Sequence, residues 1–402
     1  MTEMTPHERD AVARVGGEPM LDQVRAWAAI NSGTANLDGL GRMAAALADA
    51  FAALPGEIAL VEPEPAERVT PAGRVEPLDH GRHLHLTVRP QAPVQMLFTG
   101  HMDTVYPADH PFQNQRFLDP NTLNGPGVAD MKGGLALLLA ALKAVEASPL
   151  ASRIGYEIVI NSDEETGSFS SAALLARAAR GKVAALTYEP ALPDGTLAGA
   201  RGGTGNFSIV VTGRSAHAGR NPDDGRNAIV AASDIALRLM EAKSPTLSVN
   251  PARIDGGGPN NVVPDKAVLR VNFRPQSPDE IDRAQAHIDN VARAVSTERE
   301  VTIAVHGGFN RPPKPIDPGA QALFDLVRRS GAALGLDIAW RATGGVCDGN
   351  NIAAAGVPVV DTMGARGGAI HSPDEFLLVD SLAERAALSA LTILRIAEKG
   401  HA

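Results

Sequence analysis

The chain has 402 residues, of which 44% are hydrophobic and 21% charged, and its formal net charge is −9. This length exceeds an ordinary single core and predicts a globular protein of two domains. The acidic balance argues against a surface that binds nucleic acid. The single cysteine, Cys347, excludes an intrachain disulfide and fits a reducing compartment. We expect no signal peptide, and the longest apolar run, residues 135–142, is too short to span a bilayer, so we expect a soluble cytoplasmic protein that does not bind membranes.

Strand and helix patterns alternate in the first half of the chain. This alternation predicts a mostly parallel sheet with helices on both faces, an α/β architecture. The expected strands are 83–88, 95–100, 156–161 and 183–188, and the expected helices are 133–147 and 170–180.

The pattern changes after residues 197–205, a glycine-rich stretch with the composition of a hinge. The next elements follow the order β-α-β-β-α-β of a ferredoxin-like α+β unit. We therefore expect residues 1–200 and 312–402 to form one domain, into which 201–311 are inserted as a second. The expected elements are strand 206–213, helix 227–242, strands 246–254 and 266–275, helix 278–297, strand 301–306, helix 317–335, strand 337–341, helix 348–355, strand 357–363 and helix 379–398.

Acidic residues and histidines gather where the predicted strands of the first domain end. The carboxyl ends of parallel strands share one edge of a sheet, where ligands usually bind. A single acid at such a place is more often a helix cap or a solvated residue, so only the joint pattern carries information. The residues are His101, Asp103, Asp130, Asp163, Glu164, Glu165, Glu189 and His371.

So many carboxylates at one edge would repel one another unless a cation lies between them. Two histidines and three carboxylates are too many ligands for one tetrahedral zinc, but they suit two zinc ions with one bridging carboxylate. Of the adjacent Glu164 and Glu165, one can then bind metal while the other moves protons. Asp103 lies two residues from His101 and can orient that ring.

The motifs "TGHMDTV", "GPGVADMKGG", "DEETGS", "SAHAG" and "GAIHSPDEF" resemble, in order, those of the M20 metallopeptidase family. The chain is most similar to its glutamate carboxypeptidase (carboxypeptidase G2-like) branch. The resemblance implies a catalytic domain with two Zn²⁺ ions per subunit, Co²⁺ or Mn²⁺ being alternatives, and an inserted lid that forms a homodimer. It also implies a cis peptide bond at Asp130–Met131.

The same resemblance implies a role for each motif residue. His101 and Glu189 would be terminal metal ligands, and Asp130 would bridge both metals. Glu165 and His371 would complete the shell of the second metal. Glu164 would be the general base and then the general acid, and Asp103 would hold His101.

Residues of the inserted segment complete the expected site. The resemblance implies that Asn261 and Arg274 clamp a substrate carboxylate and that His217 donates to the oxyanion, from the neighbouring subunit. Arg311 is a weaker substrate-binding candidate, and Arg201 is weaker still. Residues 190–200 contain no lysine that could bind a glutamate side chain, so the resemblance does not fix a preference for C-terminal glutamate.

The preferred function is therefore metal-dependent hydrolysis of an amide or peptide bond in a small substrate, a dipeptide for example, that carries a free carboxylate. An N-acyl amino acid deacylase, similar to acetylornithine deacetylase, is the alternative within the class. A metal-stabilised binding protein would be expected to lack the base, and Glu164 is present. A phosphoesterase would be expected to have basic residues beside the metals, whereas this cluster is acidic. Cys347 has no sequence-local partner and is expected to be a packed thiol rather than a nucleophile.

Overall fold

A six-stranded sheet forms the centre of the larger domain, which we call the core domain. The computed structural model describes residues 3–401. The strand order is β1-β4-β8-β5-β9-β16, parallel from β8 to β16 and antiparallel toward β1. The parallel part places the carboxyl ends of β5, β8 and β9 at one edge. The strands are β1 Glu57–Val61, β4 His83–Val88, β5 Val94–His101, β8 Ile154–Asn161, β9 Ala184–Thr187 and β16 Val359–Val360.

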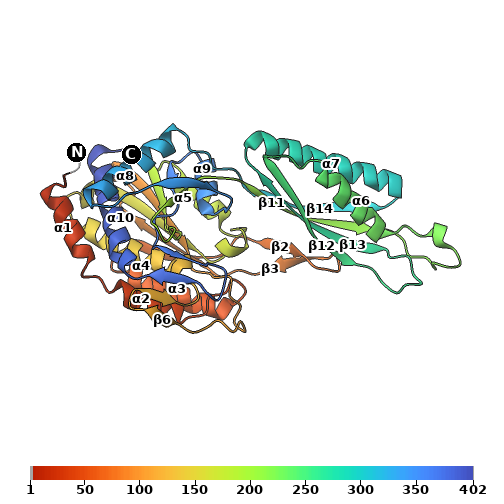
Figure 1. The fold of residues 1–402 in the computed structure, drawn as a ribbon, viewed down its shortest axis with the longest axis horizontal. Coiled ribbons are helices and arrows are strands. Elements are labelled where there is room, and N and C mark those ends of the chain that lie inside the picture. The colour runs from red at the N-terminus through yellow and green to blue at the C-terminus, as the bar shows by residue number, and fades with distance from the viewer. Residues whose placement is uncertain (1–2, 402) are drawn as a thin grey trace.

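Helices cover both faces of this sheet, as the alternation predicts (Figure 1). On β5, Met96 and Phe98 join the large core cluster with helix α4, whereas Leu97 packs with α5 and α9 on the opposite face. α4 is almost entirely buried, because its sequence is apolar on all sides. The helices are α1 Pro6–Val15, α2 Met20–Ala28, α3 Leu37–Phe51, α4 Gly133–Glu146, α5 Ala172–Ala179, α8 Pro318–Ala333, α9 Asp348–Ala354 and α10 Asp380–Lys399.

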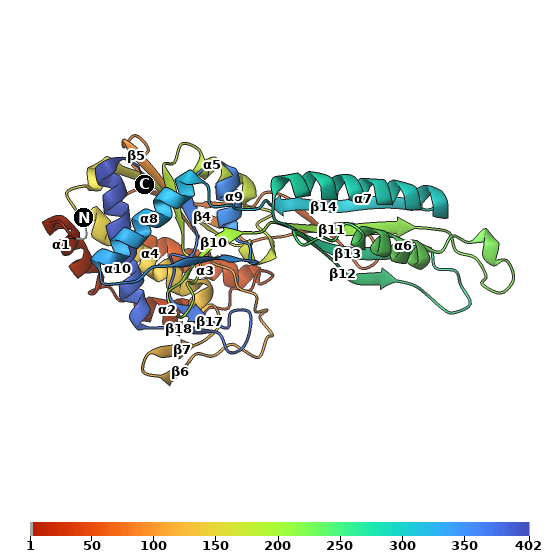
Figure 2. The same cartoon turned by 45° about the horizontal axis from the view of Figure 1, so that its top comes forward.

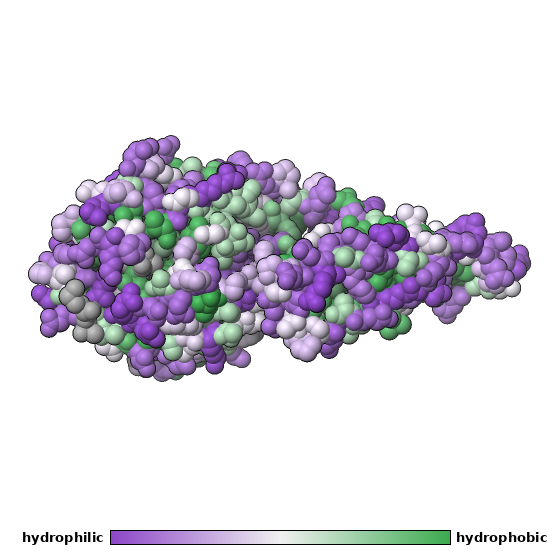
Figure 3. Space-filling model, turned by 90° about the horizontal axis from the view of Figure 1, so that it is seen from above, coloured by the Kyte–Doolittle hydropathy of each residue, from purple (hydrophilic) through white to green (hydrophobic). Residues whose placement is uncertain are grey.

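The inserted domain is a four-stranded antiparallel sheet with two helices on one face (Figure 2). Its strand order, β12-β13-β11-β14, is that of the ferredoxin-like unit expected from the sequence. The domain extends from one side of the core domain, so that the molecule is elongated and narrows toward that end (Figure 3). Its elements are β11 Thr204–Thr212, α6 Ala228–Met240, β12 Leu247–Gly256, β13 Lys266–Pro275, α7 Pro278–Arg299 and β14 Thr302–Arg311.

A hairpin of the core domain reaches across to the helix-free face of this second sheet. It consists of β2 Ala66–Val69 and β3 Val75–Leu78. The side chain of Arg270 donates a hydrogen bond of 2.7 Å to the carbonyl of Val69. At the hairpin tip Gly73, with φ +73°, lies so close to Val210 that a side chain would collide with it. The hairpin therefore packs against the inserted domain.

The glycine-rich stretch expected to be a hinge is mostly strand. Residues Leu197–Arg201 form β10, which pairs in parallel with β15, Trp340–Thr343. Arg201 and Lys314 exchange backbone hydrogen bonds of 2.9 Å, so the two crossings between the domains are tied to each other. Glycines suit this place because the chains approach closely here; a Cβ at Gly203 would lie 2.9 Å from the Arg311 carbonyl. The structure thus corrects the expectation of an irregular segment, and the role of this crossing as a hinge stays a prediction.

Smaller pieces complete the fold. The strand expected over 357–363 is regular only at β16, and the remainder turns toward His371. Within residues 3–401 the structure contains no helix with the length and apolarity needed to cross a membrane.

A four-stranded sheet borders the acidic edge, with β6 Arg116–Asp119, β7 Thr122–Asn124, β17 Gly367–Gly368 and β18 Phe376–Leu378. Short helical turns are Val128–Lys132, Ala151–Arg153, Glu164–Thr166 and Pro222–Asp224.

Candidate metal centre and active site

The histidines and acids singled out in the sequence converge at the carboxyl edge of the core sheet. His101 is the last residue of β5, and Glu164 and Glu165 begin the turn that follows β8. Glu189 lies two residues beyond the end of β9. The loop between β17 and β18 brings His371 to the same place.

Asp130 lies between the two histidines. Its Oδ1 is 3.1 Å from Nε2 of His101, and its Oδ2 is 3.3 Å from Nε2 of His371. Glu189 Oε2 is 3.8 Å from the His101 nitrogen, and Glu165 Oε2 is 3.1 Å from the His371 nitrogen. Each oxygen of Asp130 thus faces one histidine that has its own second carboxylate. The peptide bond between Asp130 and Met131 is cis, as the resemblance implies.

The cluster holds several buried carboxylates at short range. Burial, with Asp130 nearby, raises the pKa of Glu165 to about 8. Burial also raises the pKa of Glu189. Each carboxylate is therefore costly to keep charged unless a cation lies beside it, and imidazole nitrogens and carboxylate oxygens are the ligands that zinc and similar ions take.

Two groups of ligand atoms are close enough to hold an ion. One consists of His101, Asp130 and Glu165, and the other of His101, Glu164 and Glu189. The second group includes Glu164, for which the family resemblance implies the role of general base rather than metal ligand. Oε1 of Glu164, however, lies 2.8 Å from Nη2 of Arg311, although the two groups are not aligned as a hydrogen bond. A carboxylate that already has a guanidinium partner has less need of a metal ion.

Asp103 holds more than the neighbouring histidine. Nδ1 of His101 is 3.0 Å from the backbone oxygen of Asp103 and 3.4 Å from its carboxylate. The carboxylate itself accepts hydrogen bonds from the backbone N–H groups of Glu164 and Glu165, both 3.2 Å, and from Thr34 at 2.7 Å. Asp103 thereby fixes the turn after β8 to the end of β5.

Glu375 supports the site and was missed by the sequence analysis. Its carboxylate accepts backbone hydrogen bonds from Gly127, Ala129 and Asp130 at 3.0–3.1 Å. It also accepts one of 2.9 Å from the Tyr106 hydroxyl. Its place in "HSPDEF", four residues after His371, was the available signal, but the carboxylate acts on a turn far away in sequence.

The residues expected from the inserted domain lie at its two ends. Arg311 ends β14 and touches the core domain at Glu164. Arg274 lies near the end of β13, where burial, and after it the charge of Arg311, lowers the pKa of its guanidinium. His217 and Asn261 lie together beyond the other end of β13, where the Asn261 carbonyl accepts a bond of 2.9 Å from Ala218.

That second group does not reach the acidic cluster of its own chain. Nδ1 of His217 accepts backbone hydrogen bonds of 3.1 Å from Gly219 and Arg220. The loop that holds these residues, with the turn Pro222–Asp224, lies at the end of the molecule away from the core domain (Figure 1). Asn261 and Arg274 are thus separated by the length of β13, about 30 Å for ten residues.

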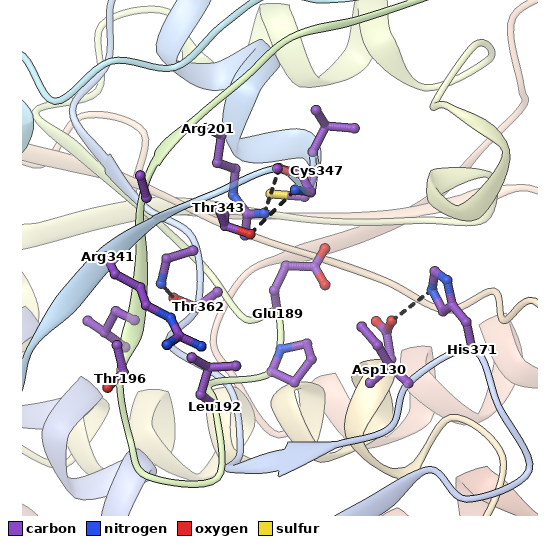
Figure 4. A pocket seen from close by; sticks show the side chains of 18 of the residues that line it. Asp130, Glu189, Leu192, Thr196, Arg201, Arg341, Thr343, Cys347, Thr362 and His371 are labelled. Carbon is purple, nitrogen blue, oxygen red and sulfur yellow. Dashed lines mark hydrogen bonds and ion pairs between the residues drawn. The ribbon is translucent and has the colours of Figure 1, made fainter. Parts of the chain in front are cut away.

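A cavity of about 580 Å³ opens beside the cluster. Asp130, Glu189 and His371 form one side of it, and Leu192, Thr196 and Arg341 lie on the other (Figure 4). This volume suits a substrate of the size of a dipeptide or an acyl amino acid. Cys347 also lines the cavity, and burial raises the pKa of its thiol well above the ordinary value, so it is not a thiolate nucleophile.

Comparison with known proteins settles the family. The profile of peptidase family M20/M25/M40 matches residues 97–395. The chain belongs to this family. Carboxypeptidase G2 of Pseudomonas sp. (strain RS-16) is 30% identical to it over 312 residues, which are 74% of this chain and 73% of that protein. Succinyl-diaminopimelate desuccinylase of Psychrobacter arcticus is 27% identical over 306 residues, 71% of this chain and 74% of the relative.

Solved M20 structures share the fold. Aminopeptidase PepT from Bacillus cereus superposes with a TM-score of 0.71 at 21% identity, covering 94% of this chain and 98% of that one. YXEP from Bacillus subtilis, described as a dinuclear metal-binding peptidase of the M20 family, superposes with a TM-score of 0.64 at 15% identity, covering 95% and 98%. The chain is therefore an M20 hydrolase, a peptidase or amidohydrolase, with the catalytic and inserted domains of that family.

Proposed function

We propose that the protein is a glutamate carboxypeptidase-like hydrolase that cleaves the amide or peptide bond of a small substrate with a free carboxylate. The observation that carries this proposal is the placement of Asp130 between His101 and His371, each with a second carboxylate. Glu164 remains beside them as a carboxylate with no necessary part in metal binding. Ligands plus a spare acid are the elements of metal-assisted hydrolysis.

Five residues would hold two divalent ions, with Asp130 as the bridge. His101 and Glu189 would complete one position, and Glu165 and His371 the other. Zn²⁺ fits these nitrogen and oxygen donors, as do Co²⁺ and Mn²⁺. Such ions, when bound, polarise a carbonyl group and lower the pKa of water.

Glu164 would move the proton. Burial raises the pKa of Glu164 to about 7, so the side chain can both accept and release a proton near neutrality. In this assignment Glu164 takes a proton from the attacking water and delivers it to the departing nitrogen. Arg311 would orient Glu164 and, with Arg274, receive the substrate carboxylate through its planar fork of donors.

The remaining two inserted-domain residues would come from a second subunit. One chain cannot bring both Asn261 and Arg274 to the same carboxylate, because they lie at opposite ends of β13. A homodimer through the inserted domains would let His217 and Asn261 of one subunit complete the site of the other. Two observations support such a contact: β12 is an edge strand, and Val230 and Leu237, seven residues apart on α6, are 45% and 72% exposed.

The alternative is an N-acyl amino acid deacylase of the acetylornithine deacetylase type. The similarity to a desuccinylase favours it, since that reaction also cleaves an amide. Both functions require the same metal ligands and differ in which substrate groups the pocket accepts. We further propose that the enzyme works in the cytoplasm, since its sole cysteine is a free, buried thiol.

A substrate screen with metal-loaded protein tests the proposal. Zinc-, cobalt- and manganese-loaded samples would be assayed by release of free amine from N-acetyl amino acids, dipeptides and acylglutamates, with methyl esters of the same compounds as controls. We expect hydrolysis of free acids, no hydrolysis of esters of the carboxylate, and no activity after chelation. Equal turnover of acids and methyl esters would contradict the requirement for a free carboxylate.

A further inference from the structure

The pocket beside the metal centre contains a cation without an ionic partner. Two arginines line it, Arg201 and Arg341. Arg201 is buried and bonded to Asp361 at 2.7 Å, so its charge is already balanced. Within residues 3–401, no ion pair or side-chain hydrogen bond engages the exposed Arg341. The pKa of Asp194, in an exposed turn, is lowered mainly by hydrogen bonds with Thr196 and more weakly by the charge of Arg341.

Strand pairing explains how Arg341 reaches this place. β15 runs parallel to β10, and Arg341 is the partner of Ala198 in that register. Residues 190–200, which lack a basic residue of their own, therefore receive one from a strand more than 140 positions later in the chain. Figure 4 shows the guanidinium beside Leu192, on the side of the pocket away from Asp130 and His371.

The surroundings suit a chain that is apolar in the middle and negative at its end. Leu192, Leu197 and Ile370 line the pocket with aliphatic side chains. The hydroxyl of Thr362 accepts a bond of 2.8 Å from the backbone N–H of Ala198, which leaves its own O–H group free to donate. A substrate that enters would place methylene groups against these residues and would meet the guanidinium beyond them.

We propose that Arg341 is a specificity-determining residue that selects substrates with a second carboxylate. This inference rests on the proposed function and adds the substrate class to it. The carboxylate could be carried by the amino acid that leaves or by the acyl group, and the shared chemistry is an aliphatic chain that ends in an anion. Arginine binds such a group through two parallel hydrogen bonds.

Matched pairs of substrates test the assignment. N-acetylglutamate and N-acetylglutamine have nearly the same shape and differ in the charge of the side chain of the leaving amino acid. N-succinylalanine and its succinamide analogue differ in the charge of the acyl group. The ratio of kcat/KM within each pair would be measured for the parent enzyme and for Arg341→Gln, Arg341→Lys and Arg341→Glu.

We expect the parent enzyme to prefer the charged member of one pair by about tenfold or more, the usual range for a charge-assisted contact. The ratio should approach one in Arg341→Gln, recover in part in Arg341→Lys and invert in Arg341→Glu. The pair that responds identifies which side of the scissile bond enters the pocket. Arg14→Gln, which removes an exposed charge from α1, is the control and should leave both ratios unchanged.

A binding measurement separates this inference from the proposed function. Calorimetry of the same four compounds on metal-loaded Glu164→Gln protein reads the charge preference without turnover. Binding that depends on charge and on Arg341, but with no hydrolysis by the parent enzyme, would refute the proposed function and support the Arg341 assignment. Hydrolysis or binding with equal preference in the parent and in Arg341→Gln would overturn the Arg341 assignment alone.

Discussion

Arg311, the last residue of β14, places its guanidinium 2.8 Å from the carboxylate of Glu164, in the turn that follows β8. Both side chains are buried. Nη2 of Arg311 also lies 2.9 Å from the Glu164 carbonyl and 3.5 Å from Asp348. The last residue of the inserted domain therefore contacts Glu164, the residue to which we assign proton transfer.

Replacing Arg311 with methionine should destabilise the metal-free protein. The change leaves two buried carboxylates without a cation, which typically costs about 3–5 kcal/mol. Burial already raises the pKa of Glu164 to about 7, and loss of Arg311 would raise it further. A raised folded-state pKa lowers stability as pH increases, so the loss should be larger at pH 8 than at pH 6. Urea unfolding at both values measures it.

The matched control is Arg283→Gln, because the Arg283 side chain is 73% exposed and lies 3.4 Å from Glu280, a buried carboxylate that keeps its hydrogen bonds from Thr246 and Gln276. Its effect should stay below about 1 kcal/mol at either pH. An Arg311→Met effect no larger than this control would show that the buried contact contributes little to stability.

Glu164→Gln and Glu165→Gln should have different consequences although the residues are adjacent. The first should keep both metal ions and lose about 10²–10⁴-fold in kcat, because only the proton carrier is removed. The second should lose metal affinity first. Metal content after dialysis and initial rates with saturating zinc distinguish them. Full activity of Glu164→Gln would place the base elsewhere.

Glu375→Ala should weaken metal binding without removing a ligand. The three backbone N–H groups that Glu375 holds belong to the turn that carries Asp130. Supporting contacts of this kind are worth about 10–100-fold in metal affinity. Competition with a chromophoric chelator measures the change, and Asp374→Ala, at the exposed neighbouring position, is the control. Equal affinities in the two variants would contradict the role of Glu375.

Mixing inactive variants tests the shared site. His217→Ala and Glu164→Gln proteins should each be nearly inactive, and re-association should restore activity through hybrid dimers with one intact site. Recovery would reach at most about one site in four, and it would be visible because an oxyanion donor is worth about 10²–10³ in rate. Proven subunit exchange without recovery would exclude His217 acting in trans.

Cys347 should resist alkylation in the folded protein. Burial raises the pKa of its thiol, so the thiolate fraction at pH 8 stays well below that of a free cysteine. Iodoacetamide should modify the denatured chain within minutes and the native chain far more slowly, as followed by intact mass. Rapid modification of native protein at pH 8 would show that the thiol is accessible and ionised.

The residues at the carboxyl ends of the parallel strands were the part of the site that could be predicted from the sequence. Parallel strands bring their carboxyl ends together whatever the loops do, so the positions of His101, Glu165 and Glu189 followed from the alternation of strands and helices. What could not be predicted depends on pairing between distant segments. Arg341 reaches the pocket through the β10–β15 register, and the glycine-rich stretch 197–205 is mostly strand because it pairs with segments far away in the sequence.

The hairpin β2–β3 changes how the inserted domain can swing. Two chain crossings alone would define an axis, and the domain could turn about it at little cost. The hairpin adds a third attachment, through Arg270 and Val69, on the helix-free face of the sheet. If the inserted domain rotates toward the pocket, the hairpin must either move with it, by bending at residues 62–65 and 79–82, or separate from the sheet. Separation would expose Val210 and Val268, which are buried, so movement of the hairpin with the domain costs less free energy.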